Sequence, residues 1–229
     1  SGRIRDSPLR RDFMNLGIFG GTFNPIHLAH LRVAEEVREA CGLDQVLFLP
    51  ASVPPHKHPA AVSFAHRCAM VEAAIADHPD FRLCAIEGER PGKSYSVDTL
   101  ELLRQRHPGD DFYFIIGLDS FRDLPLWHDY ARLFTLTHIV VATRPGVFSG
   151  DPRELLPVAL RGEFCYDCGA KTLSHRSGTS IIFVEETRLD ISSTQIRHLV
   201  GTGRSTRYLV PPTVADYIAA HGLYREQER

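Results

Sequence analysis

Short apolar runs recur along the chain and are separated by longer amphipathic segments. Strands that lack polar alternation are typical of a parallel sheet buried on both faces. On this pattern we predict β-strands at residues 16–19, 46–49, 81–86, 112–116, 138–142 and 180–184.

The intervening segments repeat apolar residues at helical spacing. The first of these segments is a stripe formed by Leu31, Ala34, Val37 and Cys41. Further helices are predicted over residues 63–76 and 97–106, and from about Ser193 and Pro212. Buried strands that alternate with helices predict an α/β fold with a doubly wound parallel sheet, whose ligands bind at the carboxyl ends of the strands.

The length of 229 residues suits a single large domain. We expect this domain to span residues 14–229, with a small helical part at about 190–225. Residues 1–13 carry several charges and little to bury, which predicts a flexible leader.

The charge balance argues against long nucleic acid as a partner, because 26 Lys and Arg face 28 Asp and Glu for a net charge of -2. No apolar run approaches the roughly 20 residues of a membrane span. We therefore expect a cytoplasmic protein without a membrane partner. The sequence leaves the oligomeric state open.

The five cysteines show no disulfide framework, and Cys41, Cys68 and Cys84 lie in apolar stretches. Cys165 and Cys168 form a C-x-x-C pair with His175 nearby, a pattern compatible with zinc or redox chemistry. A structural zinc site needs four ligands, and no second pair supplies them. We therefore predict no dedicated metal site.

The segment Gly20-Gly21-Thr22-Phe23-Asn24-Pro25-Ile26-His27-Leu28-Ala29-His30 follows the first predicted strand and is called here the glycine-histidine segment. Its glycines let backbone amides approach an anion, and the start of the next helix favours a phosphate. If the helix has begun by His27, then His27 and His30 project from one face of its first turn and converge on one oxyanion. Taken only as spacing, the segment also fits ordinary turn chemistry, a metal-ligand fragment or a polar helix face.

A second candidate anion site lies near the end of the chain. Ser192 and Gln195 have the spacing of a capping box, so a helix begins there and offers free amides. Arg197, one turn into this helix, could reach a triphosphate. The alternative is an ordinary capped helix with an exposed arginine.

One motif is rejected. Residues 88–94 resemble a P-loop, but only three residues separate the two glycines, and four are required.

The glycine-histidine segment resembles the G-G-T-F-D-P-x-H-x-G-H motif of the adenylyltransferase superfamily, and specifically of the nicotinate-nucleotide adenylyltransferases. Asn24 stands where this family usually has Asp, and Ala29 where it usually has Gly. Asn keeps a turn-forming side chain. The extra methyl group of Ala29 lies where ATP is expected to pack closely.

The resemblance extends over most of the chain after Leu16. The matching strings are Pro54-Pro55-His56-Lys57, Ser94-Tyr95-Ser96-Val97-Asp98-Thr99-Leu100, Ile116-Gly117-Leu118-Asp119-Ser120, Trp127-His128, Thr143-Arg144-Pro145-Gly146 and Ile191-Ser192-Ser193-Thr194-Gln195-Ile196-Arg197. They imply a Rossmann-like nucleotidyltransferase fold.

The resemblance also implies roles for individual residues. Catalytic roles fall on His27, His30, Lys57 and Arg197. ATP binding falls on Gly20, Gly21, Thr22, Phe23, His30, Gly117, Asp119, Ile191, Ser192, Ser193, Thr194 and Arg197. Mononucleotide binding falls on Asn24, Lys57, Tyr95, Ser96, Trp127 and Arg144.

We therefore expect transfer of AMP from ATP to nicotinate mononucleotide, with Mg²⁺ brought mainly by ATP. One alternative is a sister enzyme that uses nicotinamide mononucleotide or phosphopantetheine. Another is a nucleotide-binding regulator without turnover, for which Ala29 is the only hint. A dehydrogenase is disfavoured because no G-x-G-x-x-G follows the first strand.

Overall fold

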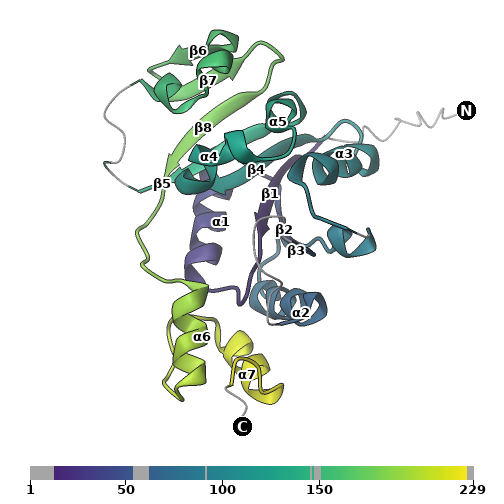
Figure 1. The fold of residues 1–229 in the computed structure, drawn as a ribbon, viewed down its shortest axis with the longest axis vertical. Helices are drawn as coiled ribbons and strands as arrows, with labels where there is room; N and C mark the ends of the chain where they lie inside the picture. Colours follow the sequence, from purple (N-terminus) through teal and green to yellow (C-terminus); the bar gives the residue numbers. More distant parts are fainter. Residues whose placement is uncertain (1–12, 54–61, 91, 145, 147–150, 226–229) are drawn as a thin grey trace, which may run out of the picture.

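A computed structural model describes residues 13–53, 62–90, 92–144, 146 and 151–225. Its centre is an eight-stranded sheet with the strand order β3-β2-β1-β4-β5-β8-β7-β6 (Figure 1). The strands are β1 (Asn15–Gly21), β2 (Gln45–Pro50), β3 (Phe81–Leu83), β4 (Asp111–Gly117), β5 (His138–Thr143), β6 (Phe164–Asp167), β7 (Thr172–His175) and β8 (Ser180–Glu185). The pairs from β3 through to β8 are parallel, whereas β7 pairs antiparallel with both β8 and β6. The predicted doubly wound sheet is confirmed.

Helices join most of the parallel strands. The α-helices are α1 (Leu28–Cys41), α2 (Phe64–Ile75), α3 (Ser96–Arg106), α4 (Leu118–Arg122), α5 (Tyr130–Leu136), α6 (Ser193–Gly201) and α7 (Pro212–Ala220). Short 3-10 helices are η1 (Ile86–Glu89), η2 (Leu124–Leu126), η3 (Pro152–Leu155) and η4 (Val158–Glu163).

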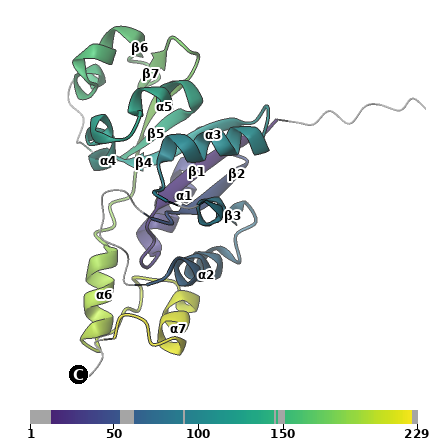
Figure 2. The ribbon, with the colours of Figure 1, turned by 45° about the vertical axis from the view of Figure 1, so that its right-hand side comes forward.

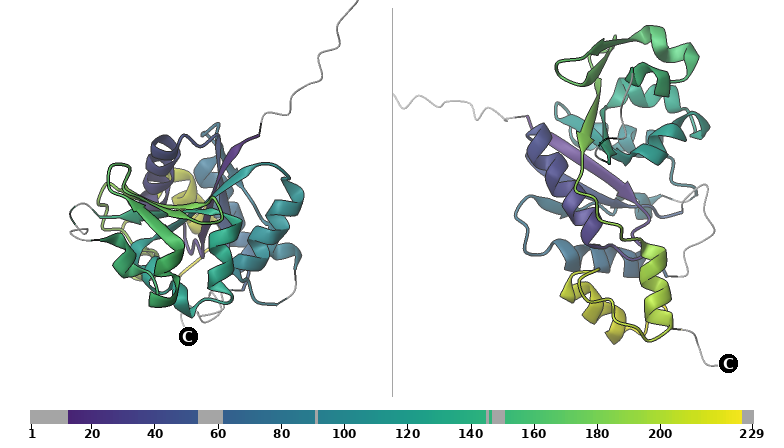
Figure 3. Two further views of the ribbon diagram at one scale, coloured as in Figure 1. Left: turned by 90° about the horizontal axis from the view of Figure 1, so that it is seen from above. Right: turned by 90° about the vertical axis from the view of Figure 1, so that its left-hand side faces the viewer.

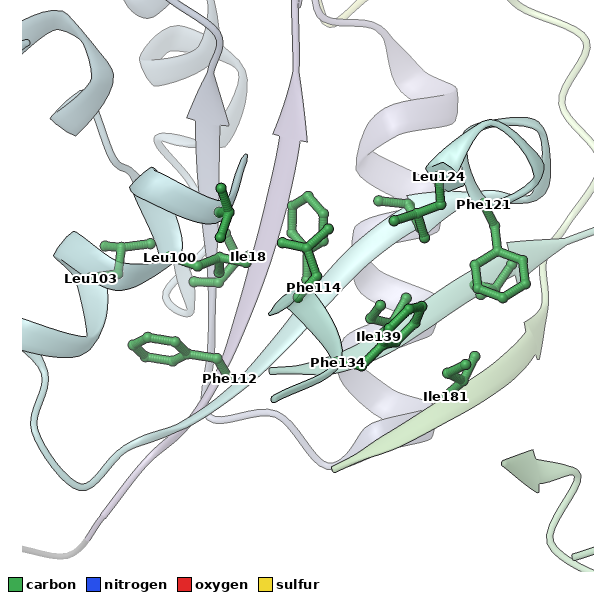
Figure 4. Close-up of a cluster of buried hydrophobic side chains, with 14 of the residues drawn as sticks. Ile18, Leu100, Leu103, Phe112, Phe114, Phe121, Leu124, Phe134, Ile139 and Ile181 are labelled. Carbon is green, nitrogen blue, oxygen red and sulfur yellow. The ribbon is translucent and has the colours of Figure 1, made fainter. Parts of the chain in front are cut away.

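The alternation of side chains along each strand builds a separate core on each face of the sheet. In β4, Phe112 and Phe114 face a core shared with α3, α4 and α5, as Figure 4 shows, while Ile115 between them belongs to the other core. That second core contains apolar residues of α1, α2, α6 and α7. The predicted strands are apolar almost throughout because both of their faces are covered.

The order of the strands reverses between β1 and β4. Strand β1 is followed along the sheet by β2 and β3 on one side and by β4 and β5 on the other. At such a reversal the loops from neighbouring strands diverge to opposite faces and leave room for a ligand. The glycine-histidine segment begins with the last two residues of β1, Gly20 and Gly21, at this point.

The two ends of the molecule carry different additions to this sheet. The β6–β7 hairpin extends it at one end, whereas α6 and α7 lie at the opposite end (Figures 1 and 2). Helix α7 packs beside α2, where the Thr213 hydroxyl donates to the Ala73 carbonyl at 2.8 Å. The views in Figure 3 show α1 and α3 on opposite sides of the sheet.

Several elements differ from the prediction. The strand predicted at residues 81–86 ends at Leu83; Cys84 and Ala85 form a short connection, and Ile86 begins η1. The hairpin β6–β7 and the helices α4 and α5 were not predicted. The hairpin strands have four residues each and α4 has five. Such short elements show too few residues for a periodic pattern to stand out.

No helix in the described ranges is both long enough and apolar enough to cross a membrane.

Truncation of Ile115 in β4 tests the second core, because its side chain is 0% exposed. We expect Ile115→Ala to lower the free energy of unfolding by about 2–5 kcal/mol, from lost burial and a residual cavity. Urea denaturation measures this change. As a control, Val158→Ala alters a residue that is 77% exposed and should change stability by less than about 0.5 kcal/mol. Equal effects of the two substitutions would contradict this description of the core.

Candidate active site

The turn between β1 and α1 places the two histidines differently from the prediction. Helix α1 begins at Leu28, and His27 is its N-cap residue with an extended backbone. Only His30 lies within the first helical turn. The predicted proximity still results, because the two imidazole rings stack with centroids 3.6 Å apart and planes at 22°.

The hydrogen bonds of the pair define the protonation of His30. Its Nδ1 accepts from the backbone N–H of His27 at 3.3 Å. A neutral imidazole that accepts at Nδ1 carries its proton at Nε2, and this N–H is a donor. The Nδ1 of His27 is buried and has no hydrogen-bond partner among the described residues.

His27 is only 5% exposed. Burial lowers the pKa of His27 to about 4, because the surroundings disfavour the charged imidazolium. The ring is therefore neutral near pH 7 and can act as a hydrogen-bond donor without carrying charge.

Helix α6 brings the second predicted anion site to this turn. Ser192 caps the helix by accepting from the Gln195 backbone N–H at 3.1 Å, as its spacing predicted. The Ser193 hydroxyl donates to the Pro25 carbonyl at 2.8 Å. Arg197 donates through Nη1 to the Asn24 carbonyl at 2.9 Å and through Nη2 to the Thr194 hydroxyl at 3.1 Å.

Asn24 has a further partner near the end of the chain. The Tyr224 hydroxyl donates to Asn24 Oδ1 at 2.7 Å. Burial raises the pKa of Tyr224, so this hydroxyl stays protonated and remains a donor. Asn24, which is 9% exposed, is thus held through its carbonyl and its side chain by two separate C-terminal residues.

A cavity of about 480 Å³ opens at the reversal of strand order. Its lining includes these residues of the prediction: Gly20, Gly21, Thr22, Tyr95, Ser96, Gly117 and Trp127. It therefore joins residues expected to bind ATP with residues expected to bind the mononucleotide. Phe19 also lines the cavity, and its ring lies edge-on to His30 with centroids 6.1 Å apart.

One wall of the cavity is aromatic. Trp127 lies edge-on to Phe114 with ring centroids 6.2 Å apart, and the ring centroids of Tyr95 and His128 are 4.5 Å apart. All four residues line the cavity. Such a wall suits a planar ring, because aromatic faces and edges pair favourably with other π systems.

Other predicted site residues lie outside this lining. The Asp119 side chain is 97% exposed and has Arg122 at 3.8 Å. Arg144 is exposed beyond β5, and Ile191 packs partly buried against the second core. Lys57 and the rest of its loop lie outside the described residues.

The structure places beside the cavity three buried polar residues to which the sequence assigned no role, although one of them, Thr99, belongs to a matching string. They are Arg67 at 1% exposure, Glu87 at 5% and Thr99 at 1%. Arg67 carried a detectable signal, because it precedes Met70 and Val71 by three and four positions and so falls on the apolar stripe of its helix. Glu87 carried no such signal, since it lies one residue beyond the strand predicted at residues 81–86.

The C-x-x-C pair is exposed on the hairpin, where Cys165 and Cys168 are both free thiols. The described part of the chain contains no cluster of three or more His, Cys, Asp or Glu side chains suited to a metal ion.

A parallel sheet with a ligand-sized cavity at its order reversal, bordered by a glycine turn and a helix start, defines a nucleotide-binding α/β protein. Comparison with known proteins narrows this class. The cytidylyltransferase-like family matches residues 18–199. A probable nicotinate-nucleotide adenylyltransferase of Syntrophotalea carbinolica is 63% identical over 217 residues, which cover 94% of this chain and 100% of the relative. One from Geobacter metallireducens is 52% identical, covering 92% and 98%.

A solved structure supports the same fold. Plasmodium falciparum nicotinic acid mononucleotide adenylyltransferase complexed with NaAD superposes with a TM-score of 0.70 at 21% identity, covering 92% of this chain and 97% of that one. The chain belongs to the cytidylyltransferase-like family and, within it, to the nicotinate-nucleotide adenylyltransferases.

The depressed pKa of His27 predicts a pH dependence of stability. The unfolded chain takes up a proton at His27 below about pH 6.5, whereas the folded protein does so only near pH 4. The stability contributed by neutral His27 is therefore complete above pH 6.5 and is lost as the pH falls towards 4, by about 3 kcal/mol. We expect the free energy of unfolding of His27→Gln to fall by about 3 kcal/mol less between pH 6.5 and pH 4 than that of the parent, as measured by urea denaturation at several pH values. His198→Gln, which alters an exposed histidine, should leave the decline unchanged. An equally steep decline in His27→Gln and the parent would contradict the assignment.

Proposed function

We propose that the protein transfers AMP from ATP to nicotinate mononucleotide and forms nicotinate adenine dinucleotide and pyrophosphate. The observation that carries this proposal is that Gly20, Gly21 and Thr22 line the same cavity as Tyr95 and Trp127. The first group suits a phosphate chain and the second a planar ring. A relative that is 63% identical over its whole length is named for this activity.

The reaction needs no covalent enzyme intermediate. A phosphate oxygen of the mononucleotide attacks the α-phosphorus of ATP, a new P–O bond forms, and the bond to pyrophosphate breaks. The attacking phosphate is already an anion, so the protein's contribution is to position both substrates and to neutralise charge on the non-bridging oxygens.

The stacked histidines are suited to this charge. His30 offers its Nε2–H, whose position is defined by the bond that Nδ1 accepts. Neutral donors aimed at developing negative charge are effective where water is excluded. Arg197 adds a permanent positive charge beside the same turn, and Lys57 would add a second.

In this proposed reaction Mg²⁺ reaches the site bound to ATP. The described residues offer no ready carboxylate cluster, and Mg²⁺ often keeps several waters and binds mainly through substrate phosphates. When bound there, it neutralises charge on the triphosphate and on the departing pyrophosphate.

An acceptor panel tests the choice of mononucleotide. We expect pyrophosphate release from ATP and Mg²⁺ to be fastest with nicotinate mononucleotide, and slower with nicotinamide mononucleotide or phosphopantetheine. A coupled pyrophosphate assay measures each rate. Faster release with another acceptor would establish a sister enzyme, and ATP binding without release from any acceptor would establish a regulator.

Substitution of His30 tests the mechanism. We expect His30→Ala to lower kcat by on the order of a hundredfold or more, because one transition-state donor is lost. Steady-state kinetics measures the change, and circular dichroism with thermal melting verifies the fold. His198→Ala is the matched control on an exposed histidine. Turnover of His30→Ala within a few fold of the parent would rule out this mechanism.

A further inference from the structure

Arg67 of α2 is a buried cation that touches two loops at the edge of the cavity. Its Nη1 donates to the Thr22 carbonyl at 2.8 Å, and its Nη2 donates to the Ser52 carbonyl at 3.2 Å. Thr22 follows β1, and Ser52 follows β2. The guanidinium therefore links the loops at the carboxyl ends of two neighbouring parallel strands.

Glu87 holds the same loop from its other side. Its Oε2 accepts from the Ser52 backbone N–H at 3.1 Å, and its Oε1 accepts from the Thr99 hydroxyl at 2.9 Å. Glu87 lies in η1, just after β3, and lines the cavity. The carbonyl of Ser52 is thus bound by a buried cation, and its amide by a buried anion.

The chain of bonds continues into the region expected to bind the mononucleotide. The Thr99 hydroxyl belongs to α3 and also accepts from Arg90 Nη2 at 2.8 Å. Beside Ser52, Val53 and Ser94 are joined by two bonds, from the Val53 amide to the Ser94 hydroxyl at 3.2 Å and from the Ser94 amide to the Val53 carbonyl at 3.0 Å. Ser94 lines the cavity two residues before Ser96.

We propose that Arg67, Glu87 and Thr99 are positioning residues that hold the glycine turn and the mononucleotide side of the cavity at a set separation. This inference rests on the proposed function. Arg67 and Thr99 lie outside the lining of the cavity, and Glu87, which lines it, has both carboxylate oxygens bonded to Ser52 and Thr99. The three residues therefore act on the geometry of the loops and take no part in the chemical step.

The burial of these groups supports a positioning role. Removing a charge from water is costly, and apolar residues of similar size often stabilise a core better than a buried ion pair. Here the charges bind backbone groups at the ends of two neighbouring strands, β1 and β2, where an apolar side chain would leave the Ser52 amide and carbonyl without partners. The polar network therefore specifies one arrangement of the loops.

Glu87→Gln is the central test, with Glu89→Gln as its matched control. Both glutamates lie in η1, but the Glu89 side chain is 55% exposed and pairs with Arg106. Gln at position 87 places an N–H group against one of two hydrogen-bond donors. We expect it to raise KM for the accepted mononucleotide by on the order of tenfold, with a smaller rise in KM for ATP, because Arg67 still binds Thr22. Arg67→Lys should raise both KM values, since Lys cannot reproduce the paired donors.

Two more conservative substitutions test the same contacts with less risk of misfolding. Thr99→Val removes one hydroxyl at nearly constant volume and should also raise the KM for the mononucleotide. Thr99→Ser retains the hydroxyl and should keep this KM at the value of the parent protein. Amide hydrogen exchange at Ser52 should be faster in Glu87→Gln and Thr99→Val than in Glu89→Gln and Thr99→Ser.

The possible results separate this inference from the proposed function. If Glu87→Gln and Thr99→Val melt at a lower temperature but keep both KM values within twofold of the parent, the residues are merely structural and the inference is overturned. If the parent releases no pyrophosphate with any acceptor, the proposed function fails. Exchange at Ser52 then decides the inference, and equal rates in the variants and their controls overturn it.

Discussion

The contact on which the site depends is the stack of His27 on His30 at the start of α1. Its geometry requires a β-strand to end, turn and enter a helix within a few residues, with one histidine before the helix and the other in its first turn. The hydrogen bond from the His27 amide to His30 Nδ1 sets the tautomer of the second ring. Burial keeps the first ring neutral. Two neutral imidazoles can therefore lie against each other without the repulsion that two imidazolium ions would experience.

This turn does not hold itself in place. Its carbonyls at Asn24 and Pro25 are bound by Arg197 and Ser193, and its Asn24 side chain by Tyr224. The Leu28 amide donates to the Leu209 carbonyl at 3.0 Å, which also satisfies one of the unpaired amides at the start of α1. Residues more than 160 positions later thus complete the N-terminal segment. The C-terminal helices therefore hold the turn in place. Arg197 both binds the Asn24 carbonyl and adds a positive charge beside the turn.

A second set of polar contacts holds the loops that follow β1, β2 and β3. Strands β1, β2 and β3 are neighbours, and the loops after them meet at Ser52. Arg67 approaches from α2, and Thr99 from α3, so helices on opposite faces of the sheet both contribute to one edge. Glu87 of this network lines the cavity, whereas Ser193, Arg197 and Tyr224 hold the turn from outside the lining. The C-terminal contacts with the turn and the contacts of Arg67 and Glu87 all join segments that are distant in sequence.

Local pattern alone determined much of this protein. Apolar runs without alternation located the parallel strands, because strands covered on both faces must be apolar on both. Ser192 and Gln195 located the start of α6 for a similarly local reason, since a cap is formed within four residues. The resemblance of the glycine-histidine segment led to the family, while Asp119, Arg144 and Lys57 keep the roles it implies as predictions. Only the tertiary structure decided that His27 precedes its helix, that Tyr224 reaches Asn24, and that Arg67 and Glu87 meet at Ser52. These contacts join residues up to 200 positions apart, and no periodicity within a short window records which distant backbone group a buried side chain will bind.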